Sequence, residues 1–555
     1  MEPIIECVPN FSEGNDPGII RQITDQIESV DGVRLLNVDP GKATNRTVVT
    51  FVGPPAAVVE AAFRAIQKAG TLIDMSRHKG AHPRMGATDV CPLIPVANIS
   101  MEETARWATE LARRVGEELM IPVYLYEAAQ PNKARSNLSV IRAGEYEGFF
   151  KKISLPEWKP DFGPAVFDEK RGGTVIGARD FLVAYNVNLN TTSTRRANAI
   201  AFDVREAGRK VKNEKGEEFV QPGSLKCVKA IGWYIEEYGV AQISINLTNI
   251  LVTPVHIAFD EVCRRAEARG IRVTGSELVG LIPLQAMLDA GKYFLRKQKR
   301  SVGVSEKELI KIAVKSMGLD ELYPFKPEEK IIEYRLREPS LSRLVSMKLN
   351  DFADETASES PAPGGGSIAA YVGALGVSLG TMVANLSSHK KGWDDRWEEF
   401  GDWAEKGQQY KETLLKLVDA DTQAFNQIMS AFSLPKSNLQ EQEARKLSIQ
   451  QATKKAIEVP FQVMETALAS MDLIEAMAES GNPNSVSDAG VGALCARAAV
   501  SGAFMNVRIN AGGYEDKAYV RQLLQTGREM EDRAKEKENR ILAAVDAKIN
   551  ASLPA

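Results

Sequence analysis

Cysteine and histidine are scarce in this chain of 555 residues, which has only five cysteines and four histidines. The cysteines are Cys7, Cys91, Cys227, Cys263 and Cys495. They are odd in number, lie far apart and form no CxxC pair, which argues against a disulfide framework and against a zinc knuckle. We therefore expect the protein in a reducing cytoplasm.

An excess of charge of one sign is also lacking, because the formal net charge is only −4. Such a balance gives no general attraction to nucleic acid or to an anionic membrane, so neither is expected as a partner. The N-terminus has no basic segment before an apolar run, so no signal peptide is expected. Apolar residues make up 44% and charged residues 26% of the chain, which is ordinary for a globular protein of two to four domains.

Strand and helix patterns alternate through most of the first half of the chain. Residues 1–180 and 181–326 are each predicted to form an α/β subdomain of the split βαβ, ferredoxin-like type. Two such subdomains in tandem predict a ligand crevice between them. The glycine-rich stretch 161–180 is predicted to be a long surface loop. Residues 327–340 are a predicted linker, and 341–555 lack strand signals and are predicted to form an all-α antiparallel helical bundle.

The stretch 74–96 holds two of the four histidines, His78 and His82. Three cations surround them: Arg77, Lys79 and Arg84. The i, i+4 spacing of the histidines binds zinc on a helix, but Gly80 and Pro83 break a helix here and the cations repel a metal. A histidine on a loop among cations suits proton transfer near an anionic substrate. The alternative is an ordinary surface or core histidine whose hydrogen bonds are satisfied within the protein.

Two apolar segments stand out in the predicted bundle. Residues 367–386 carry no charge, and residues 488–510 are nearly as apolar and rich in small side chains. Each is long enough to span a bilayer. Because strongly amphipathic helices surround them, we expect helices that are buried on all faces inside a soluble bundle.

Three polar features flank these segments. Gly364, Gly365, Gly366 and Ser367 open the first apolar helix, where free N–H groups favour an anion, although a flexible joint is the alternative. Asp419 and Asp421 lie on a helix at i, i+2, so one of them can face solvent while the other enters the bundle. Asp488 is a helix-start residue that either caps the helix or faces a ligand.

Several motifs together resemble one family. They are HKGAHPRMGATDVCPLIPV, the stretch 163–172, AQISINLTNI with VTPVHIAFDEVC, PAPGGGSIAAYVGALG, VDADTQAFN and NVRIN. In this order they resemble the bifunctional formimidoyltransferase-cyclodeaminases of histidine degradation, over essentially the whole chain. One departure is Ala81, where the family pattern has an acidic residue before the histidine.

The resemblance implies two activities in one-carbon metabolism. The first half would transfer a formimidoyl group from N-formimidoyl-L-glutamate to tetrahydrofolate. The second would close 5-formimidoyl-tetrahydrofolate to 5,10-methenyltetrahydrofolate and release ammonia. Two alternatives remain for the bundle: a methenyltetrahydrofolate cyclohydrolase, or an oligomerisation module without chemistry. The resemblance also implies a homo-oligomer built from dimers, with polyglutamylated tetrahydrofolate as co-substrate and no metal.

The resemblance assigns roles to individual residues. His82 matches the catalytic histidine of the transferase and Asp421 the catalytic carboxylate of the cyclodeaminase, with Asp488 as a lesser candidate. The first turn Gly364–Ser367 would hold the glutamate tail of folate. The implied folate-binding loop is Gly163, Pro164, Ala165, Val166, Phe167, Asp168, Glu169, Lys170, Arg171 and Gly172.

The remaining candidates concern the substrate. Asp39 is expected to orient the folate or the histidine. We expect Arg77, Lys79 and Arg84 to bind the substrate carboxylates, because cations on the histidine loop suit bidentate or point-charge contacts with an anion.

Overall fold

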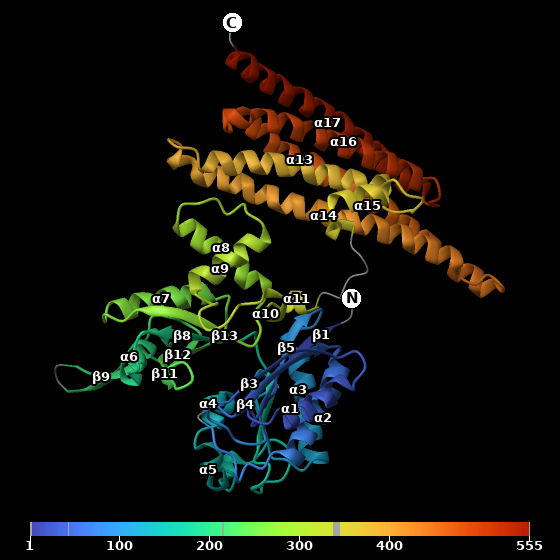
Figure 1. Cartoon of the computed structure of the whole chain (residues 1–555). Helices are drawn as coiled ribbons and strands as arrows, with labels where there is room; N and C mark the ends of the chain where they lie inside the picture. Colours follow the sequence, from blue (N-terminus) through green and yellow to red (C-terminus); the bar gives the residue numbers. More distant parts are fainter. Residues whose placement is uncertain (1–2, 43, 81, 214–215, 337–343, 554–555) are drawn as a thin grey trace. The chain divides into compact units, whose positions relative to one another are not determined.

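The computed structural model describes residues 3–42, 44–80, 82–213, 216–336 and 344–553. They form two compact units. The first comprises Met1–Ala290 and Ala313–Glu338, and the second comprises Gly291–Ile312 and Pro339–Ala555. Figure 1 shows the strands in the first unit and the long helices in the second. The departure of Ala81 from the family pattern lies outside the described residues.

The first subdomain is built on a seven-stranded sheet. Its strands are β1 (Ile4–Cys7), β2 (Asn10–Phe11), β3 (Arg34–Gly41), β4 (Arg46–Gly53), β5 (Thr88–Ala97), β6 (Val123–Glu127) and β7 (Thr174–Ala178). Strand β1 pairs antiparallel with both β4 and β5, and β3 pairs with β4, which is the predicted split βαβ arrangement. Strands β7 and β6 extend this sheet in parallel.

Helices cover one face of this sheet, and alternation along the strands decides which residues they bury. Helices α1 (Pro17–Glu28), α2 (Pro55–Leu72) and α3 (Met101–Glu118) pack there over Ile5, Cys7, Phe51 and Leu93. Intervening residues such as Glu6 therefore point to the opposite face. Ser100 begins α3 with a capping box that satisfies the first N–H groups of the helix.

The prediction that residues 161–180 form a surface loop is wrong for its last part. Strand β7 lies between β5 and β6, and its side chains are buried. Gly177 was misleading, because it marks a close approach within the sheet: a Cβ there would lie 2.2 Å from the Tyr126 carbonyl oxygen. The glycine content of this stretch therefore favoured a loop prediction where the structure has a strand inside the sheet.

The second subdomain repeats the split βαβ arrangement, as predicted. Its elements are β8 (Val183–Leu189), α6 (Thr194–Val204), β11 (Val228–Ile235), β12 (Val240–Leu247), α7 (Val255–Glu267) and β13 (Val273–Val279). The strand order is β11-β12-β8-β13. A hairpin that the sequence patterns did not indicate, β9 (Arg209–Lys212) with β10 (Glu218–Gln221), is inserted after α6.

Short helical elements complete the first half and its connection. They are η1 (Lys133–Arg135), α4 (Leu138–Ile141), α5 (Glu145–Lys152), η2 (Pro156–Trp158), α8 (Leu284–Lys297), α9 (Glu306–Met317), α10 (Pro327–Lys330), α11 (Ile332–Leu336), η3 (Leu344–Ser346) and α12 (Leu349–Thr356).

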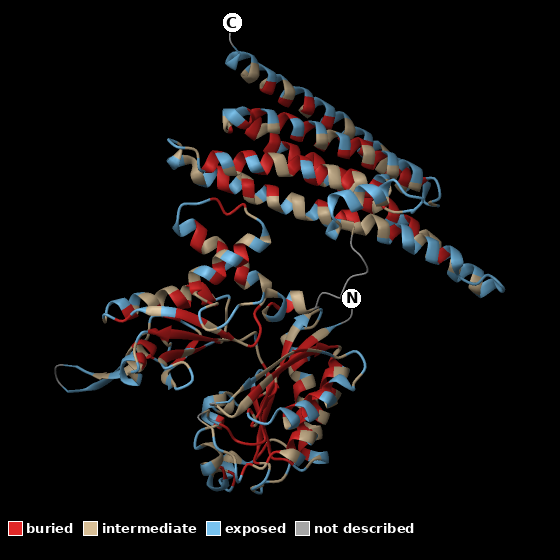
Figure 2. Cartoon of the chain, viewed as in Figure 1, coloured by how far each residue is buried: buried red, intermediate tan, exposed pale blue. Residues whose placement is uncertain are grey.

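The second unit contains a helical bundle, as predicted. Its helices are α13 (Gly365–Ser388), η4 (Asp394–Arg396), α14 (Trp397–Ser433), α15 (Leu439–Ser480), η5 (Pro483–Ser485), α16 (Val486–Ala511) and α17 (Lys517–Ser552). Helices α13 and α16 contact closely through small residues, since a Cβ on Gly376 would lie 2.8 Å from the Gly492 carbonyl oxygen. Figure 2 shows buried residues along the inner faces of these helices.

Two stretches, Gly365–Ser388 and Pro483–Ala511, are long and apolar enough to cross a membrane. Within the described residues, 61% and 56% of their most apolar windows are buried inside the protein. The expectation of helices buried on all faces is met only in part, because large apolar side chains such as Leu375 and Ile509 are 47% and 77% exposed.

The segment Gly291–Ile312 packs with the bundle. The Gly303 carbonyl oxygen accepts hydrogen bonds from Asn385 Nδ2 at 2.8 Å and from Gln408 Nε2 at 3.0 Å. Lys292 Nζ forms an ion pair with Glu405 at 2.5 Å. The boundary placed at 326/327 from the sequence stays a prediction, as do the other domain limits.

Candidate active sites

A cavity of about 820 Å³ lies in the first unit between the two sheets. Its walls come from the helix-free face of the first sheet and from strands of the second subdomain. From the first sheet, Glu6, Val8 and Thr50 line it, and from the second, Trp233 and Ser244. The crevice that two tandem α/β layers predicted is therefore present. We call it the inter-sheet cavity.

His82 lines the inter-sheet cavity, and the backbone that follows it is tightly held. Gly86 forms a bridge with Gly172, and the Gly86 carbonyl oxygen accepts a hydrogen bond from Ser12 Oγ at 2.8 Å. A Cβ on Gly86 would lie 2.3 Å from the Gly173 carbonyl oxygen, so only glycine fits. The segment carrying His82 is thus anchored within five residues of the imidazole.

The hydrogen bonds of His82 define which ring nitrogen is available. Nδ1 lies 2.7 Å from the Pro83 carbonyl oxygen, which can only accept, so Nδ1 carries the proton. Nε2 receives a close contact from Nη1 of Arg46, which can only donate. The imidazole is therefore the neutral Nδ1–H tautomer, and Nε2 is its acceptor.

Burial has the largest effect on His82 and, together with the charges of Arg46 and Arg142, lowers its pKa to about 2 against the opposing hydrogen bond to the Pro83 carbonyl oxygen. Arg142 is held by an ion pair with the buried Asp89, at 2.6 Å. Asp89 also accepts from the Met85 N–H at 3.0 Å. Burial lowers the pKa of Arg46 to about 10, so its guanidinium remains charged near neutral pH. Two cations thus keep the imidazole unprotonated.

Both arginines have a buried Nε–H group without a hydrogen-bond partner among the described residues. Arg46 and Arg142 line the inter-sheet cavity, where a ligand can reach them. Unpaired buried donors on cations favour a carboxylate ligand. The geometry therefore places an anion-binding site beside His82.

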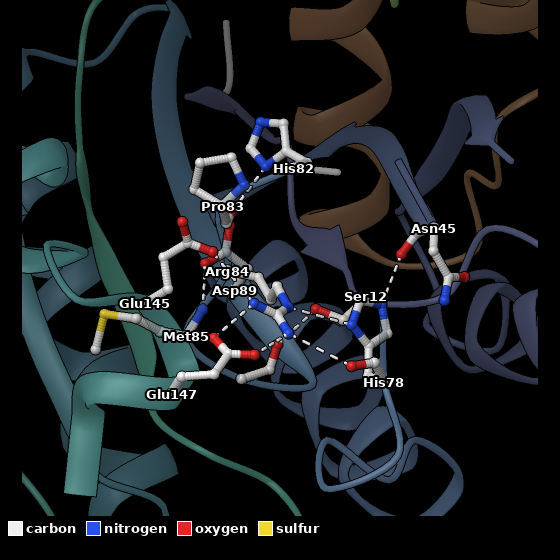
Figure 3. Close-up of polar contacts among 11 residues, drawn as sticks. Ser12, Asn45, His78, His82, Pro83, Arg84, Met85, Asp89, Glu145 and Glu147 are labelled. Atoms are coloured by element: carbon white, nitrogen blue, oxygen red, sulfur yellow. Dashed lines mark hydrogen bonds and ion pairs between the residues drawn. The ribbon is translucent and has the colours of Figure 1, made fainter. Parts of the chain in front are cut away.

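The three cations that the sequence assigned to the substrate lie elsewhere. Arg77 and Lys79 are exposed and are not among the residues that line the inter-sheet cavity. Arg84 is buried, and Figure 3 shows its guanidinium between Glu147 and His78. It pairs with Glu147 at 2.6 Å and with Glu145 at 3.2 Å, so carboxylates of the protein already occupy it.

The ring nitrogens of His78 and His82 have different hydrogen-bond partners, so the two side chains are not arranged to share a metal ion. His78 Nε2 contacts the Asn45 carbonyl oxygen at 2.9 Å, and its Nδ1 accepts from Arg84 Nε at 3.3 Å. Figure 3 shows the two imidazoles apart. Within the described residues, no three His, Cys, Asp or Glu side chains are grouped so that they could hold a metal ion.

The loop 163–172 supports the His82 segment but does not line the inter-sheet cavity. Gly172 bridges Gly86, and the Arg171 carbonyl oxygen accepts from the Ala87 N–H at 2.8 Å. Asp39 lies at the junction of the two subdomains, where its Oδ2 accepts from the Gly280 N–H at 2.9 Å. Neither Asp39 nor this loop contacts His82 through a described hydrogen bond, and their roles toward folate stay predictions.

In the second unit, Asp421 on α14 meets the glycine-rich start of α13. Its Oδ2 accepts a hydrogen bond from Ser367 Oγ at 3.0 Å. A Cβ on Gly366 would lie 2.2 Å from Asp421 Oδ1, so the missing side chain makes room for the carboxylate. Burial raises the pKa of Asp421, while hydrogen bonds from the Ser367 hydroxyl and backbone act in the opposite direction.

Helix α16 contributes the side-chain amide of Asn506 to the region around Asp421 and the start of α13. A Cβ on Gly365 would lie 3.3 Å from Asn506 Nδ2 and 3.6 Å from its Oδ1. Asn506 is 18 residues from Asp488 on α16, or about 27 Å along the helix. Within one chain, Asp488 therefore lies away from Asp421, and its role as the lesser candidate carboxylate stays a prediction.

Comparison with known proteins covers the same regions. The family model described as the N-terminal subdomain of the formiminotransferase domain matches residues 4–179, that of the formiminotransferase domain matches 184–337, and that of formiminotransferase-cyclodeaminase matches 348–529. The formimidoyltransferase-cyclodeaminase of Gallus gallus is 44% identical over 547 residues, which are 98% of this chain and 99% of that protein.

The chain belongs to the formimidoyltransferase-cyclodeaminase family. Each half also has shorter relatives. The glutamate formimidoyltransferase of Thermoplasma acidophilum is 43% identical over 53% of this chain and 92% of its own length. The methenyltetrahydrofolate cyclohydrolase of Methylorubrum extorquens is 37% identical over 36% of this chain and 97% of its own length. As a member of this family, the protein is a bifunctional transferase and cyclodeaminase.

Sequence reasoning missed Arg46, Arg142, Glu6 and Asn506 in this family member. Arg46 begins an ordinary apolar strand, and Arg142 follows a short helix without any special pattern. The one available signal was Asn506 in the quoted NVRIN motif. The remaining three become recognisable only in the folded protein, where they line the inter-sheet cavity.

Gly366→Ala is expected to displace the Asp421 carboxylate, because the new Cβ would overlap with Oδ1. Cyclodeaminase activity should fall by about 100-fold or more, which is the usual cost of misplacing a reacting group. Glutamate release by the transferase should be unchanged. Ammonia release and glutamate release, assayed separately, check this.

Gly364→Ala is the matched control, because its Cβ would meet only the Pro361 carbonyl oxygen at 3.8 Å. Equal losses in the two variants would show that helix flexibility, and not the space for Asp421, sets the activity.

Proposed function

We propose that the inter-sheet cavity is the transferase site and that the Asp421 region of the bundle is the cyclodeaminase site. The first would move the formimidoyl group from N-formimidoyl-L-glutamate to the 5-nitrogen of tetrahydrofolate. The second would close 5-formimidoyl-tetrahydrofolate to 5,10-methenyltetrahydrofolate and release ammonia. The observation that carries this division is the neutral His82, which lines a cavity beside two cations with unpaired donors.

In the transfer, the proton balance calls for one group that accepts and then returns a proton. The 5-nitrogen attacks the formimidoyl carbon and loses its proton to Nε2 of His82. The tetrahedral intermediate then collapses, and the imidazolium returns that proton to the nitrogen of the departing glutamate. General acid–base catalysis of this kind contributes about 10²- to 10⁴-fold.

The substrate anion would prepare His82 for this role. Arg46 and Arg142 are the proposed partners of the glutamate carboxylates, in place of the exposed Arg77 and Lys79. A carboxylate is a better acceptor for a guanidinium than an imidazole nitrogen, so binding would draw Arg46 away from Nε2. The same negative charge raises the pKa of His82 and lets the ring hold a proton.

In the cyclisation, Asp421 would act as general acid and base. The 10-nitrogen attacks the same carbon, and ammonia must leave protonated. Burial raises the pKa of Asp421, which makes its protonated form more accessible near neutral pH. Once ionised, the carboxylate also offsets the positive charge of the methenyl product.

His82→Ala is expected to lower transfer by about 10²- to 10⁴-fold and to leave cyclisation of added 5-formimidoyl-tetrahydrofolate intact. Asp421→Asn is expected to do the reverse. Glutamate release, ammonia release and methenyl absorbance would be followed for both variants. Survival of transfer in His82→Ala, or of ammonia release in Asp421→Asn, would remove that residue from the mechanism.

Arg46→Gln is expected to raise KM for formimidoylglutamate by about 10- to 100-fold, since a charge-assisted hydrogen bond is lost. KM for tetrahydrofolate should change less. Initial rates at varied concentrations of each substrate measure both constants. Lys79→Gln is the comparison that represents the cations chosen from sequence, and a larger effect there would favour those exposed residues.

A second activity deserves the same assay, because a relative of the bundle is a methenyltetrahydrofolate cyclohydrolase. Water would then attack the carbon that ammonia leaves in the cyclodeaminase reaction. Measuring the hydrolysis of added methenyltetrahydrofolate distinguishes cyclohydrolase activity from cyclodeaminase activity. A bundle that only assembles the protein would show neither reaction and no effect of Asp421→Asn.

We further propose a cytoplasmic homo-oligomer built from dimers that uses polyglutamylated tetrahydrofolate and no metal. Exposed apolar side chains on α13 and α16 support a contact with a second copy. They are Leu375, Met382, Leu386, Val491, Leu494, Met505 and Ile509. The first turn of α13 has no side-chain cap on Gly364 and would suit a glutamate tail.

A further inference from the structure

Glu6 is a buried carboxylate without a partner. Its side chain alternates with the core residues Ile5 and Cys7 on β1, so the strand directs it to the inter-sheet cavity. Glu6 is only 2% exposed. Among the described residues, no hydrogen bond or ion pair reaches its carboxylate. A carboxylate in such a place is costly unless something satisfies it.

Other buried acids in the described chain show what is missing at Glu6. Asp89 pairs with Arg142, and it also accepts from a backbone N–H. The side chain of Asp203 is 6% exposed and pairs with Arg269 at 2.5 Å. These carboxylates have structural partners that explain their burial. Glu6 has no such partner among the described residues. Its burial is therefore explained if a ligand in the cavity binds it.

Several of the residues that line the cavity with Glu6 are apolar or aromatic. Burial raises its pKa to about 7, and the charge of Arg179 is the only opposing influence. Val8, Pro92 and Tyr126 line the same cavity and provide surfaces against which a flat ring can pack. A ligand that donates two hydrogen bonds from a planar, largely apolar ring would match this place.

We propose that Glu6 binds the pyrimidine edge of the tetrahydrofolate pterin, with its two carboxylate oxygens accepting from the ring N3–H and the 2-amino group. This assignment rests on the proposed transferase function of the cavity. The two donors are adjacent in one plane, which suits the two oxygens of one carboxylate. Glu6 is thus a specificity-determining residue for the folate.

The other substrate fits Glu6 poorly. Formimidoylglutamate carries two carboxylates, which Glu6 would repel and which Arg46 and Arg142 attract.

Glu6→Gln tests the proposal by equilibrium binding of tetrahydrofolate to the full-length protein. One class of binding sites should weaken by about 10- to 100-fold, the usual cost of losing a hydrogen bond to a charged group. A second class, in the bundle, should be unchanged and serves as an internal control. Glu127→Gln removes an exposed carboxylate at the rim of the same cavity and should have no such effect.

A 2-desamino-2-methyl analogue of tetrahydrofolate identifies the contact itself. The wild type should bind it about 10- to 100-fold more weakly than tetrahydrofolate at the first class of sites. Glu6→Gln should bind the two compounds about equally there, because neither compound then has a carboxylate to which a 2-amino group could donate. An undiminished preference for the 2-amino group in Glu6→Gln would overturn the proposal.

Stability separates a binding role from a structural one. The pKa of Glu6 in the folded protein is raised above its ordinary value of 4.5 to about 7. Its stabilising contribution is therefore complete below pH 4.5 and is lost as the pH rises through 7. Glu6→Gln should have a higher Tm than the wild type at pH 8 and a similar Tm near pH 4.5. A lower Tm at pH 8 would show that Glu6 holds the fold together.

Failure of this proposal differs from failure of the proposed function. If wild type transfers formimidoyl groups and Glu6→Gln binds tetrahydrofolate equally well, only the Glu6 assignment falls. If wild type binds tetrahydrofolate through Glu6 but transfers nothing, the pterin subsite stands and the transferase assignment falls.

Discussion

The contact between the Arg46 guanidinium and Nε2 of His82 is the interaction on which the proposed transferase site depends. It requires the imidazole to be neutral and fixes its tautomer. It also occupies the nitrogen that the reaction needs. Strand β4 supplies the arginine, whereas the glycine contact between residues 86 and 172 holds the histidine segment. In the proposed mechanism, an anionic substrate competes for the Arg46 guanidinium and frees Nε2 of His82 in the same step.

The fold was largely predictable because the periodicities of its elements differ. Alternating strands and 3.6-residue helices indicated two split βαβ subdomains and a bundle. Two features were hidden for physical reasons. Strand β7 is short and contains a glycine that serves a close approach, so local pattern favoured a loop. The packing of Gly291–Ile312 with the bundle depends on contacts with residues about 80 to 115 positions later, such as Asn385, which no local pattern reports.

The candidate site was predictable only where chemistry was concentrated in one segment. His82 stood out because it is rare and lies among glycine, proline and cations. Arg46 and Glu6 stand on ordinary strands, and Arg142 ends a short helix; strand pairing and the ion pair of Arg142 with Asp89 bring them to one cavity. Arg84 shows the opposite situation: nearness in sequence favoured a substrate role, which stays a prediction, but Glu145 and Glu147, more than sixty residues later, pair with it. Residues that contact one another in the structure are thus far apart in the sequence, and residues close in the sequence have different partners.

Glycine acts in both halves by leaving room, and the occupant differs. At Gly86 the room is taken by backbone, and at Gly366 by the carboxylate of Asp421. The glycine-rich start of α13 was interpreted as a place for an external anion, whereas the protein's own carboxylate occupies part of it. A helix N-terminus stabilises a carboxylate and lowers its pKa, yet the pKa of Asp421 is raised. Burial therefore outweighs the helix and the Ser367 hydrogen bonds, and this balance supports the proposed role of Asp421 as a proton donor beside a helix start.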